Sequence, residues 1–153
     1  MVRFALDTNV LVYAEGVNLA PGEIRKQELA LRFVARAPDA SIVIARQCLA
    51  EFHWVLVRRA RLTPKAAASR MRPWARDAEL IDTNATVFDA ALDLASDHGV
   101  PIFDAVILAA AVEARCDLLL SEDFHDGFAW RGVVVTNPFG ETPDPRLARL
   151  LAA

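Results

Sequence analysis

The amino-acid sequence predicts an α/β fold in which helices cover both faces of a parallel sheet. Short apolar runs alternate with helix-length segments along the chain, and no two-residue hairpin turn joins one run to the next. The chain has 153 residues, 54% of them hydrophobic, and no repeat or linker divides it. We therefore expect a single domain over residues 1–153 with a substantial core. Ligands of such sheets collect beyond the carboxyl ends of the strands, so chemistry is expected there.

Runs rich in β-branched and apolar residues mark the expected strands. Arg3–Leu6 is the first, and the SIVIA run at Ser41–Ala45 has the strongest β-branched character. In chain order, the remaining strands are expected at Glu79–Ile81, Leu118–Leu120 and Val133–Thr136.

Helices are expected between these strands. The first starts near Thr8. Apolar spacing predicts a second over Pro21–Ala37, which Pro38 closes. Another helix, over Gln47–Ala60, follows the second strand.

Capping signals mark the later helices. Thr63–Pro64 combines an N-cap residue with proline at the first helical position. A further helix is expected to begin at Asp82 or Thr83 and to end at Gly99. The helix from Phe103 to about Ala114 has no polar residue after its first turn until its end, so it should be buried on nearly every side.

Composition excludes several classes of protein. No apolar run approaches the roughly 20 residues that span a bilayer, and the N-terminal run already contains Asp7, so neither a membrane span nor a signal peptide is expected. Cys48 and Cys116 lie in apolar stretches and are expected to be buried free thiols. These features favour the cytoplasm.

Charge gives a weaker indication of a partner. The net charge of −3 does not point to nucleic acid. Seven of the 17 basic residues nevertheless fall between Arg58 and Arg76. They could form a phosphate-facing rim, although a solvated helical face is the commoner outcome.

Four acidic residues stand in apolar surroundings, and each also has an ordinary structural explanation. Asp7 ends the first strand and could cap the next helix. Glu51 borders an apolar helical stripe, where Arg58 or Arg59 could pair with it. Asp104 lies in the first turn of an apolar helix, where the helix dipole favours an acid. Asp123 follows a buried strand and could be a loop residue, while its neighbour Glu122 is expected to face solvent.

The four acids together indicate a metal site. In a parallel sheet their positions converge on one edge, and two carboxylates about 4 Å apart repel by roughly 4 kcal/mol at an effective dielectric near 20. Such a group takes up protons or binds a cation, and oxygen ligands suit Mg²⁺ or Mn²⁺. A metal of this kind activates water and neutralises phosphate charge, so phosphodiester hydrolysis is the natural reaction.

Several short motifs resemble those of one known family. The chain is similar to PIN-domain nucleases, in particular the VapC-type toxin ribonucleases of bacterial type II toxin–antitoxin pairs, over about Val2 to Phe139. The matching pieces are Phe4–Asn9, Glu51, Phe103–Ile107, Cys116–Asp117, Leu119–Phe124 and Asn137–Phe139.

The resemblance implies a three-layer α/β/α sandwich with a central parallel sheet of about five strands. It also implies an RNA-cleaving enzyme whose cognate antitoxin lies across the site, and a homodimer. Asp7, Glu51, Asp104 and Asp123 would hold one or two Mg²⁺ or Mn²⁺ ions. Among supporting residues, Asn9 and Ser121 would orient the acids, Thr8 would cap the first helix, and Asp126 would add a ligand through water. Phe103 departs from the family, which often has Trp or Tyr there.

Two rival functions are less well supported. A phosphatase using Asp7 as nucleophile needs a second nearby acid, where Asn9 stands, and a late lysine, whereas the chain has only Lys26 and Lys65. A PIN-like module that binds RNA or protein without cutting has little reason to keep four mutually repelling acids. The three tryptophans could stack on RNA bases, although packing is the commoner role for Trp.

Overall fold

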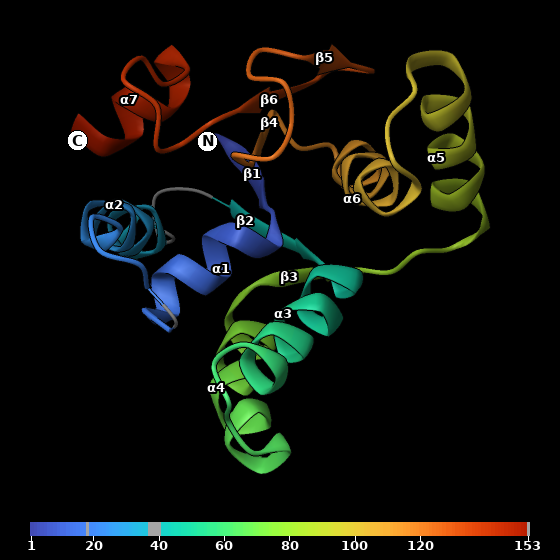
Figure 1. Cartoon of the computed structure of the whole chain (residues 1–153). Helices are drawn as coiled ribbons and strands as arrows, with labels where there is room; N and C mark the ends of the chain where they lie inside the picture. The colour runs from blue at the N-terminus through green and yellow to red at the C-terminus, as the bar shows by residue number, and fades with distance from the viewer. Residues whose placement is uncertain (18, 37–40, 153) are drawn as a thin grey trace.

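The computed structural model describes residues 1–17, 19–36 and 41–152, so Pro38, expected to close the second helix, lies outside the described residues. Within these ranges a six-stranded sheet has the order β3-β2-β1-β4-β6-β5. Figure 1 shows α1 and α2 on one side of the sheet and α5 and α6 on the other, which confirms the predicted sandwich. The strands are β1 (Arg3–Leu6), β2 (Ser41–Ala45), β3 (Glu79–Ile81), β4 (Leu118–Leu120), β5 (Ala129–Trp130) and β6 (Val133–Thr136).

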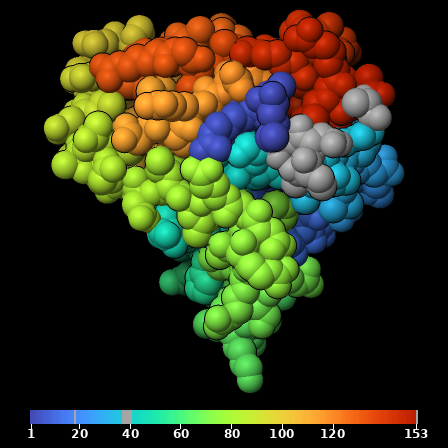
Figure 2. Space-filling model, turned by 180° about the vertical axis from the view of Figure 1, so that it is seen from behind, coloured from blue at the N-terminus to red at the C-terminus, as the bar shows by residue number. Residues whose placement is uncertain are grey.

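Seven helices are present in the described part of the chain. Two of them, α3 and α4, pack against each other and project together from the sheet, so that they form the narrow end of the molecule in Figure 2. The helices are α1 (Thr8–Glu15), α2 (Ile24–Ala35), α3 (Arg46–Arg58), α4 (Pro64–Asp77), α5 (Ala85–His98), α6 (Ile102–Glu113) and α7 (Pro145–Ala152).

The expected strands all form, and they pair in parallel. Ala5 of β1 lies opposite Val43 of β2 on one side and Leu119 of β4 on the other. The chain thus runs outward from β1 through β2 and β3, then returns to the other side of β1 with β4. The crevice between β1 and β4 is therefore the topological switch point, where open α/β sheets bind ligands.

One strand was not predicted, and it makes the sheet mixed. β5 is two residues long and runs antiparallel to β6. Arg131 and Gly132 join the two strands with φ angles of 46° and 90°, the left-handed backbone that two-residue hairpin turns require. The expectation that no two-residue hairpin occurs was therefore wrong at this edge. The amphipathic helix α7, which buries Leu147 and Leu150, was also not anticipated.

Helix starts agree with the sequence for α1 and α4, and they differ for α5 and for α2, which begins at Ile24 rather than Pro21. Thr63 accepts the Ala66 N–H and Pro64 opens α4, as predicted. The helix expected from Asp82 or Thr83 instead begins at Ala85, because Asn84 accepts the Val87 N–H over 2.9 Å. Thr8 does not cap α1; it is the first helical residue, and Asp7 is the N-cap.

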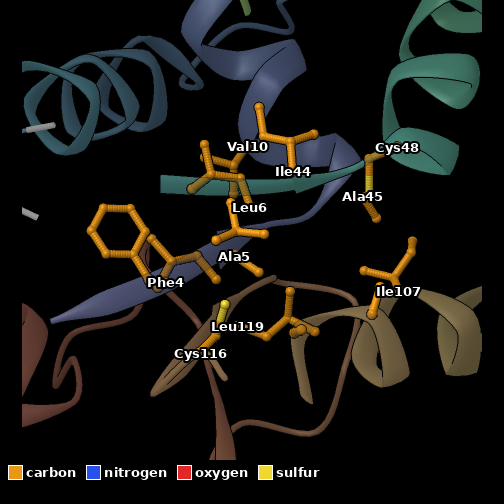
Figure 3. Close-up of a cluster of buried hydrophobic side chains, with 14 of the residues drawn as sticks. Phe4, Ala5, Leu6, Val10, Ile44, Ala45, Cys48, Ile107, Cys116 and Leu119 are labelled. Atoms are coloured by element: carbon orange, nitrogen blue, oxygen red, sulfur yellow. The ribbon is translucent and has the colours of Figure 1, made fainter. Parts of the chain in front are cut away.

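The core lies on both faces of β1. Figure 3 shows Phe4 and Leu6 of β1 together with Ile44 of β2, Leu119 of β4 and Ile107 of α6, all of them buried. The residues of α6 from 105 to 111 are all buried, as its apolar sequence predicts. Cys48 and Cys116 are buried free thiols, also as expected. This packing fixes the strand ends from which the polar side chains of the switch point project.

Candidate active site

Asp7 and Ser121 meet at the switch point, one at the end of β1 and the other at the end of β4. The Ser121 hydroxyl donates to Asp7 Oδ2 over 2.6 Å, and the Thr8 N–H donates to Asp7 Oδ1 over 2.7 Å. The Asp7 N–H in turn donates to the Leu120 carbonyl. Asp7 is thus both helix cap and site residue, so the two interpretations of its sequence position are compatible.

Burial makes the Asp7 carboxylate unstable as an anion. The residue is only 3% exposed. Burial raises the pKa of its carboxyl to about 6; the hydrogen bonds from Ser121 and Thr8 lower it, and the charges of Asp123 and Asp104 raise it again. At neutral pH the group is mostly charged and no cation of the described chain is paired with it, which is a setting that favours binding one.

Asp104 interacts electrostatically with the same group of acids as Asp7. It lies in the first turn of α6 and is half-buried. Burial raises the pKa of its carboxyl, and the charges of Asp123 and Glu51 raise it further. Within the described ranges, no donor or cation pairs with its carboxylate.

Glu51 reaches the site from α3. Its Oε2 accepts from the Thr8 hydroxyl over 2.8 Å, and its Oε1 accepts from Gln47 Nε2 over 3.1 Å. The alternative in which Arg58 or Arg59 neutralises Glu51 does not occur among the residues that the structure describes. Thr8 therefore links α1 to α3 rather than capping α1. Gln47 was missed, although its i, i+4 spacing to Glu51 was a usable signal.

Asn9 and Asp123 form the outer part of the site. Asn9 Nδ2 donates to Asp123 Oδ2 over 3.0 Å, and the Asp123 N–H donates to the Ser121 hydroxyl oxygen over 3.2 Å. Asn9 and Ser121 thus both contact Asp123, and their expected role in orienting the acids stays a prediction. Asn9 Oδ1 is buried and has no hydrogen-bond partner in the described structure, so it is an oxygen available to a ligand.

Asp126 is not drawn into this cluster. It is exposed, and its Oδ1 accepts the Asn137 N–H over 2.8 Å, which fastens its loop to the end of β6. The structure therefore gives Asp126 a local structural contact rather than a place among the coupled acids.

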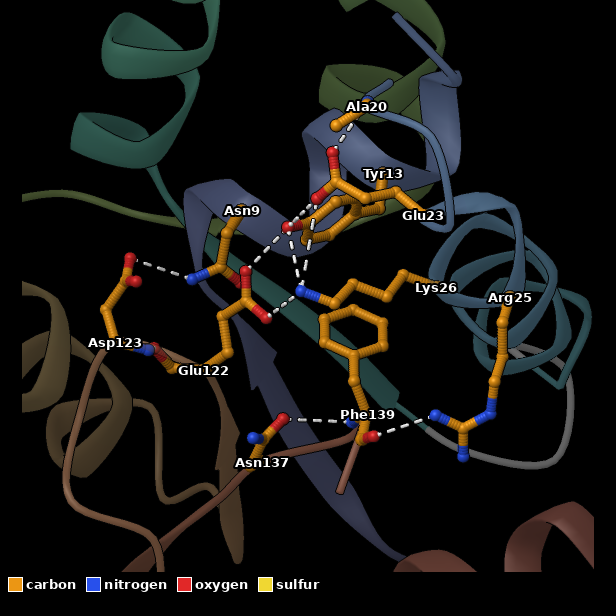
Figure 4. Close-up of polar contacts among 11 residues, drawn as sticks. Asn9, Tyr13, Ala20, Glu23, Arg25, Lys26, Glu122, Asp123, Asn137 and Phe139 are labelled. Carbon is orange, nitrogen blue, oxygen red and sulfur yellow. Dashed lines mark hydrogen bonds and ion pairs between the residues drawn. The ribbon is translucent and has the colours of Figure 1, made fainter. Parts of the chain in front are cut away.

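Glu122 does not face solvent, contrary to expectation. Its Oε1 accepts from the Tyr13 hydroxyl over 2.7 Å, and its Oε2 pairs with Lys26 Nζ at 2.8 Å. Tyr13 also contacts Glu23 Oε2 at 2.8 Å, and Lys26 lies over the Tyr13 and Phe139 rings (Figure 4). This buttress, formed by Tyr13, Glu23, Lys26 and Glu122, holds the segment that carries Asp123.

The residues fit a divalent cation without forming a finished metal site. No three His, Cys, Asp or Glu side chains among the described residues are close enough together to hold an ion as they stand. The four acids are nevertheless coupled through their charges, the donors are all oxygen, and the buried Asn9 Oδ1 is unpartnered. An oxygen-only set of this kind suits Mg²⁺ or Mn²⁺, which keep several waters.

A cavity of about 930 Å³ opens beside these acids. Thr8, Asn9, Glu51 and Asp123 line it, together with apolar residues of α1 and α3. Two large aromatic side chains on its wall are exposed, Trp54 by 53% and Phe103 by 68%. The space beside the acids is large enough for a ligand of several functional groups.

The fold and the acids at its switch point define an α/β domain with a carboxylate-lined cavity. The sequence pattern of the PIN domain matches residues 4–128, and the chain belongs to this family, whose members are typically metal-dependent nucleases. No curated protein matches the chain in sequence.

Solved structures support the same assignment. The chain is similar to a DNA-bound VapBC from Salmonella typhimurium, with a TM-score of 0.65 and 16% identity over 90% of this chain and 99% of that one. A toxin–antitoxin complex from Klebsiella pneumoniae gives a TM-score of 0.64 and 19% identity over 90% and 98%. VapC20 of Mycobacterium tuberculosis, a sarcin–ricin loop cleaving toxin, gives 0.60 and 17% over 76% and 86%. The structural neighbours are VapC toxins, and at these identities the likeness establishes the fold.

Within the described ranges, none of the helices has both the length and the apolar character needed to cross a bilayer.

Proposed function

We propose that this protein is a metal-dependent ribonuclease in which Asp7, Glu51, Asp104 and Asp123 hold Mg²⁺ or Mn²⁺. One observation carries the proposal. Four acids from β1, α3, α6 and the segment after β4 share a field at the switch point, and no arginine or lysine in the described chain is paired with Asp7, Glu51, Asp104 or Asp123. Without a bound cation, the mutual repulsion of these four carboxylates is a cost that no basic side chain of the described chain offsets.

The four acids and the ion would have different roles in the reaction. A bound divalent ion would supply a more acidic water and offset phosphate charge. Asp7, whose two carboxylate oxygens accept from Ser121 and Thr8, would hold the ion with a side chain already fixed in place. Glu51 and Asp123 are oriented by Thr8 and Asn9, while Asp104 is left free of protein donors in the described structure and is available to the ion or its water.

The decisive experiment measures cleavage of an end-labelled RNA by the purified protein with Mg²⁺ or Mn²⁺ and with excess EDTA. We expect cleavage only with metal, and loss of cleavage in Asp104→Asn. Asp89→Asn, which changes an exposed acid of α5 in the same way, is the matched control and should cut normally. Equal cleavage in EDTA, or full activity of Asp104→Asn, contradicts the proposal. A folded protein that binds RNA and never cuts it points instead to a non-catalytic PIN-like module.

The biological role proposed here is that of the toxin of a VapBC-type pair, with RNA as substrate and a cognate antitoxin as partner. The Klebsiella pneumoniae relative is a toxin–antitoxin complex, and VapC20 cleaves the sarcin–ricin loop, which supports both parts. We expect growth arrest when the protein is expressed alone in bacteria, and normal growth with Asp104→Asn at equal soluble expression. Normal growth with the wild type would remove the toxin role while leaving the nuclease proposal standing. The homodimer implied by the family is part of the same proposal, and light scattering on the purified protein tests it.

A further inference from the structure

Gln47 lies in the first turn of α3 and lines the cavity beside the acids. The N-cap of α3 is Ala45, the last residue of β2, so Gln47 follows the end of that strand almost directly. It precedes Glu51 by one helical turn, and residues four apart lie on the same face of a helix. The side chain of Gln47 therefore stands beside the carboxylate that α3 contributes to the site.

The side-chain amide of Gln47 has two acceptors, which belong to different helices. Its Nε2 lies 3.1 Å from Glu51 Oε1 in α3 and 3.1 Å from the carbonyl oxygen of Phe103 in α6. An amide nitrogen carries two protons, so it can donate one to each oxygen. Because both neighbours are acceptors, the amide nitrogen, and not the amide oxygen, must face them.

The Phe103 oxygen belongs to the peptide bond that leads into Asp104. A carbonyl oxygen accepts two hydrogen bonds, so it can accept from Gln47 and still take part in the first turn of α6. In the part of the chain that the structure describes, no other hydrogen bond joins α3 to α6, and no donor contacts the Asp104 carboxylate. Gln47 is thus the polar contact that relates the turn carrying Asp104 to the turn carrying Glu51.

Both oxygens of Glu51 are held by neutral donors. The Thr8 hydroxyl donates to Oε2 over 2.8 Å, and Gln47 donates to Oε1. A lysine or arginine in the place of Gln47 would neutralise the acid and compete with a cation for it. An amide and a hydroxyl instead orient the carboxylate and keep its charge, and each oxygen retains a lone pair for an ion.

We propose that Gln47 is a positioning residue, which sets the separation of Glu51 and Asp104 so that one divalent ion can contact both. This inference rests on the proposed function and adds to it a residue that acts through the two acids. The charge of Glu51 raises the pKa of Asp104, so the two carboxylates are within electrostatic reach and repel each other when no ion is bound. A donor bonded to both helices opposes this repulsion, so the two acids are arranged before the ion arrives.

Titration of the purified protein with Mn²⁺, followed by the electron paramagnetic resonance signal of the free ion, tests the inference. Gln47→Met keeps the length of the side chain and removes both donors, so it should weaken Mn²⁺ binding roughly 10- to 100-fold, the usual effect of losing a hydrogen-bond partner of metal ligands. Gln27→Met makes the same change at the other glutamine of the sequence, in α2 and outside the cavity lining. It is the matched control and should bind Mn²⁺ like the wild type.

A more conservative variant guards against a loss of folding in Gln47→Met. Gln47→Asn keeps the amide and shortens the side chain by one methylene, so it cannot reach both acceptors, which already lie 3.1 Å from Nε2. We expect it to weaken Mn²⁺ binding as well. Circular dichroism and urea unfolding in EDTA establish that each variant is folded, and Gln47→Asn decides the result if Gln47→Met is not.

A double variant separates positioning from a general structural role. Three acids remain in Glu51→Gln, so its Mn²⁺ binding should be weakened but measurable. If Gln47 acts through Glu51, adding Gln47→Met to Glu51→Gln should reduce the affinity by a much smaller factor than Gln47→Met does in the wild type. A purely structural role of Gln47 gives the same factor in both backgrounds.

Two results would overturn the inference: folded Gln47 variants that bind Mn²⁺ as tightly as Gln27→Met, or an equal loss of affinity in the two backgrounds. The titrations contain no RNA, so they separate this inference from the proposed activity. Mn²⁺ binding that depends on Gln47 in a protein that never cuts RNA sustains the inference and refutes the nuclease. Metal-dependent cleavage by a protein whose Mn²⁺ binding is independent of Gln47 does the reverse, and a wild type that binds no Mn²⁺ refutes both.

Discussion

Ser121 Oγ lies 2.6 Å from Asp7 Oδ2, a buried hydrogen bond between residues 114 positions apart in the chain. It joins the ends of the two strands that flank the switch point, and it stabilises the charged form of the Asp7 carboxyl, which lowers a pKa that burial raises. The same hydroxyl oxygen accepts the Asp123 N–H, so one serine orients two of the four acids.

Ser121→Ala tests this role. The hydrogen bond lowers the pKa of Asp7, so its loss should raise that pKa above about 6. If deprotonated Asp7 is required, the acidic limb of the pH–rate profile for metal-dependent cleavage moves to higher pH. An unchanged limb, in a variant whose circular dichroism shows a native fold, would mean that Ser121 does not tune Asp7.

Asp7→Asn should stabilise the metal-free protein while abolishing cleavage. In the unfolded chain Asp7 titrates near 3.8, and in the folded protein at about 6, so between these values the folded state holds a proton that the unfolded state has lost. The contribution of Asp7 to the stability of the folded protein is therefore greatest below pH 3.8. It falls as the pH rises to about 6 and is constant at higher pH. A two-unit shift corresponds to on the order of 3 kcal/mol.

Urea unfolding in EDTA measures this effect. We expect Asp7→Asn to exceed the wild type by about 1–3 kcal/mol at neutral pH, with the gain shrinking toward pH 4, because asparagine still caps the helix. Lower stability of the variant at neutral pH would show that Asp7 is held as a structural residue and not strained as an unpaired anion.

Removal of the metal gives the complementary prediction. A cation that binds the folded state alone raises its stability with metal concentration, by about 2.7 kcal/mol when the free ion is 100 times the dissociation constant. Mg²⁺ or Mn²⁺ should therefore raise the melting temperature of the wild type, and EDTA should reverse the change. Asp104→Asn should respond much less, while Asp89→Asn should respond fully. Equal responses of all three proteins would place the ion elsewhere.

The strands and the four acids were accessible to sequence reasoning because their signals are local. A β-branched run such as Ser41–Ala45 reports its own burial, and an acid such as Asp104 beside an unbroken apolar helix is conspicuous. The cap of α1 was misplaced by one residue because Asp7 and Thr8 are both good N-cap types, and only the backbone geometry separates them. The same holds for α5, where Asp82 pairs with Arg46 and leaves the cap to Asn84.

Other features depend on contacts that no local pattern reports. β5 has two residues, and its Arg131–Gly132 turn lacks the usual Asn-Gly signal. Glu122 looked like a solvent-facing neighbour of Asp123, because its partners Tyr13 and Lys26 belong to helices about a hundred positions earlier. The basic residues between Arg58 and Arg76 were visible in the sequence, but the projection of α3 and α4 from the body of the molecule required the structure.

The buttress that holds Glu122 gives the last prediction. The Tyr13 hydroxyl has one proton and lies within 2.8 Å of both Glu23 and Glu122, and burial together with these two carboxylates raises the pKa of the phenol, so it stays a donor. Tyr13→Phe removes that donor and leaves Lys26, together with the Ala20 N–H on Glu23, as the remaining partners of the two carboxylates in the described structure. We expect a loss of about 1–2 kcal/mol in urea unfolding. Adding Glu23→Gln removes one charge and supplies an amide donor, so the double variant should recover part of the loss, whereas Glu23→Gln alone should not stabilise the wild type. Strictly additive effects of the two changes would show that Tyr13 and Glu23 act independently and that no shared proton couples them.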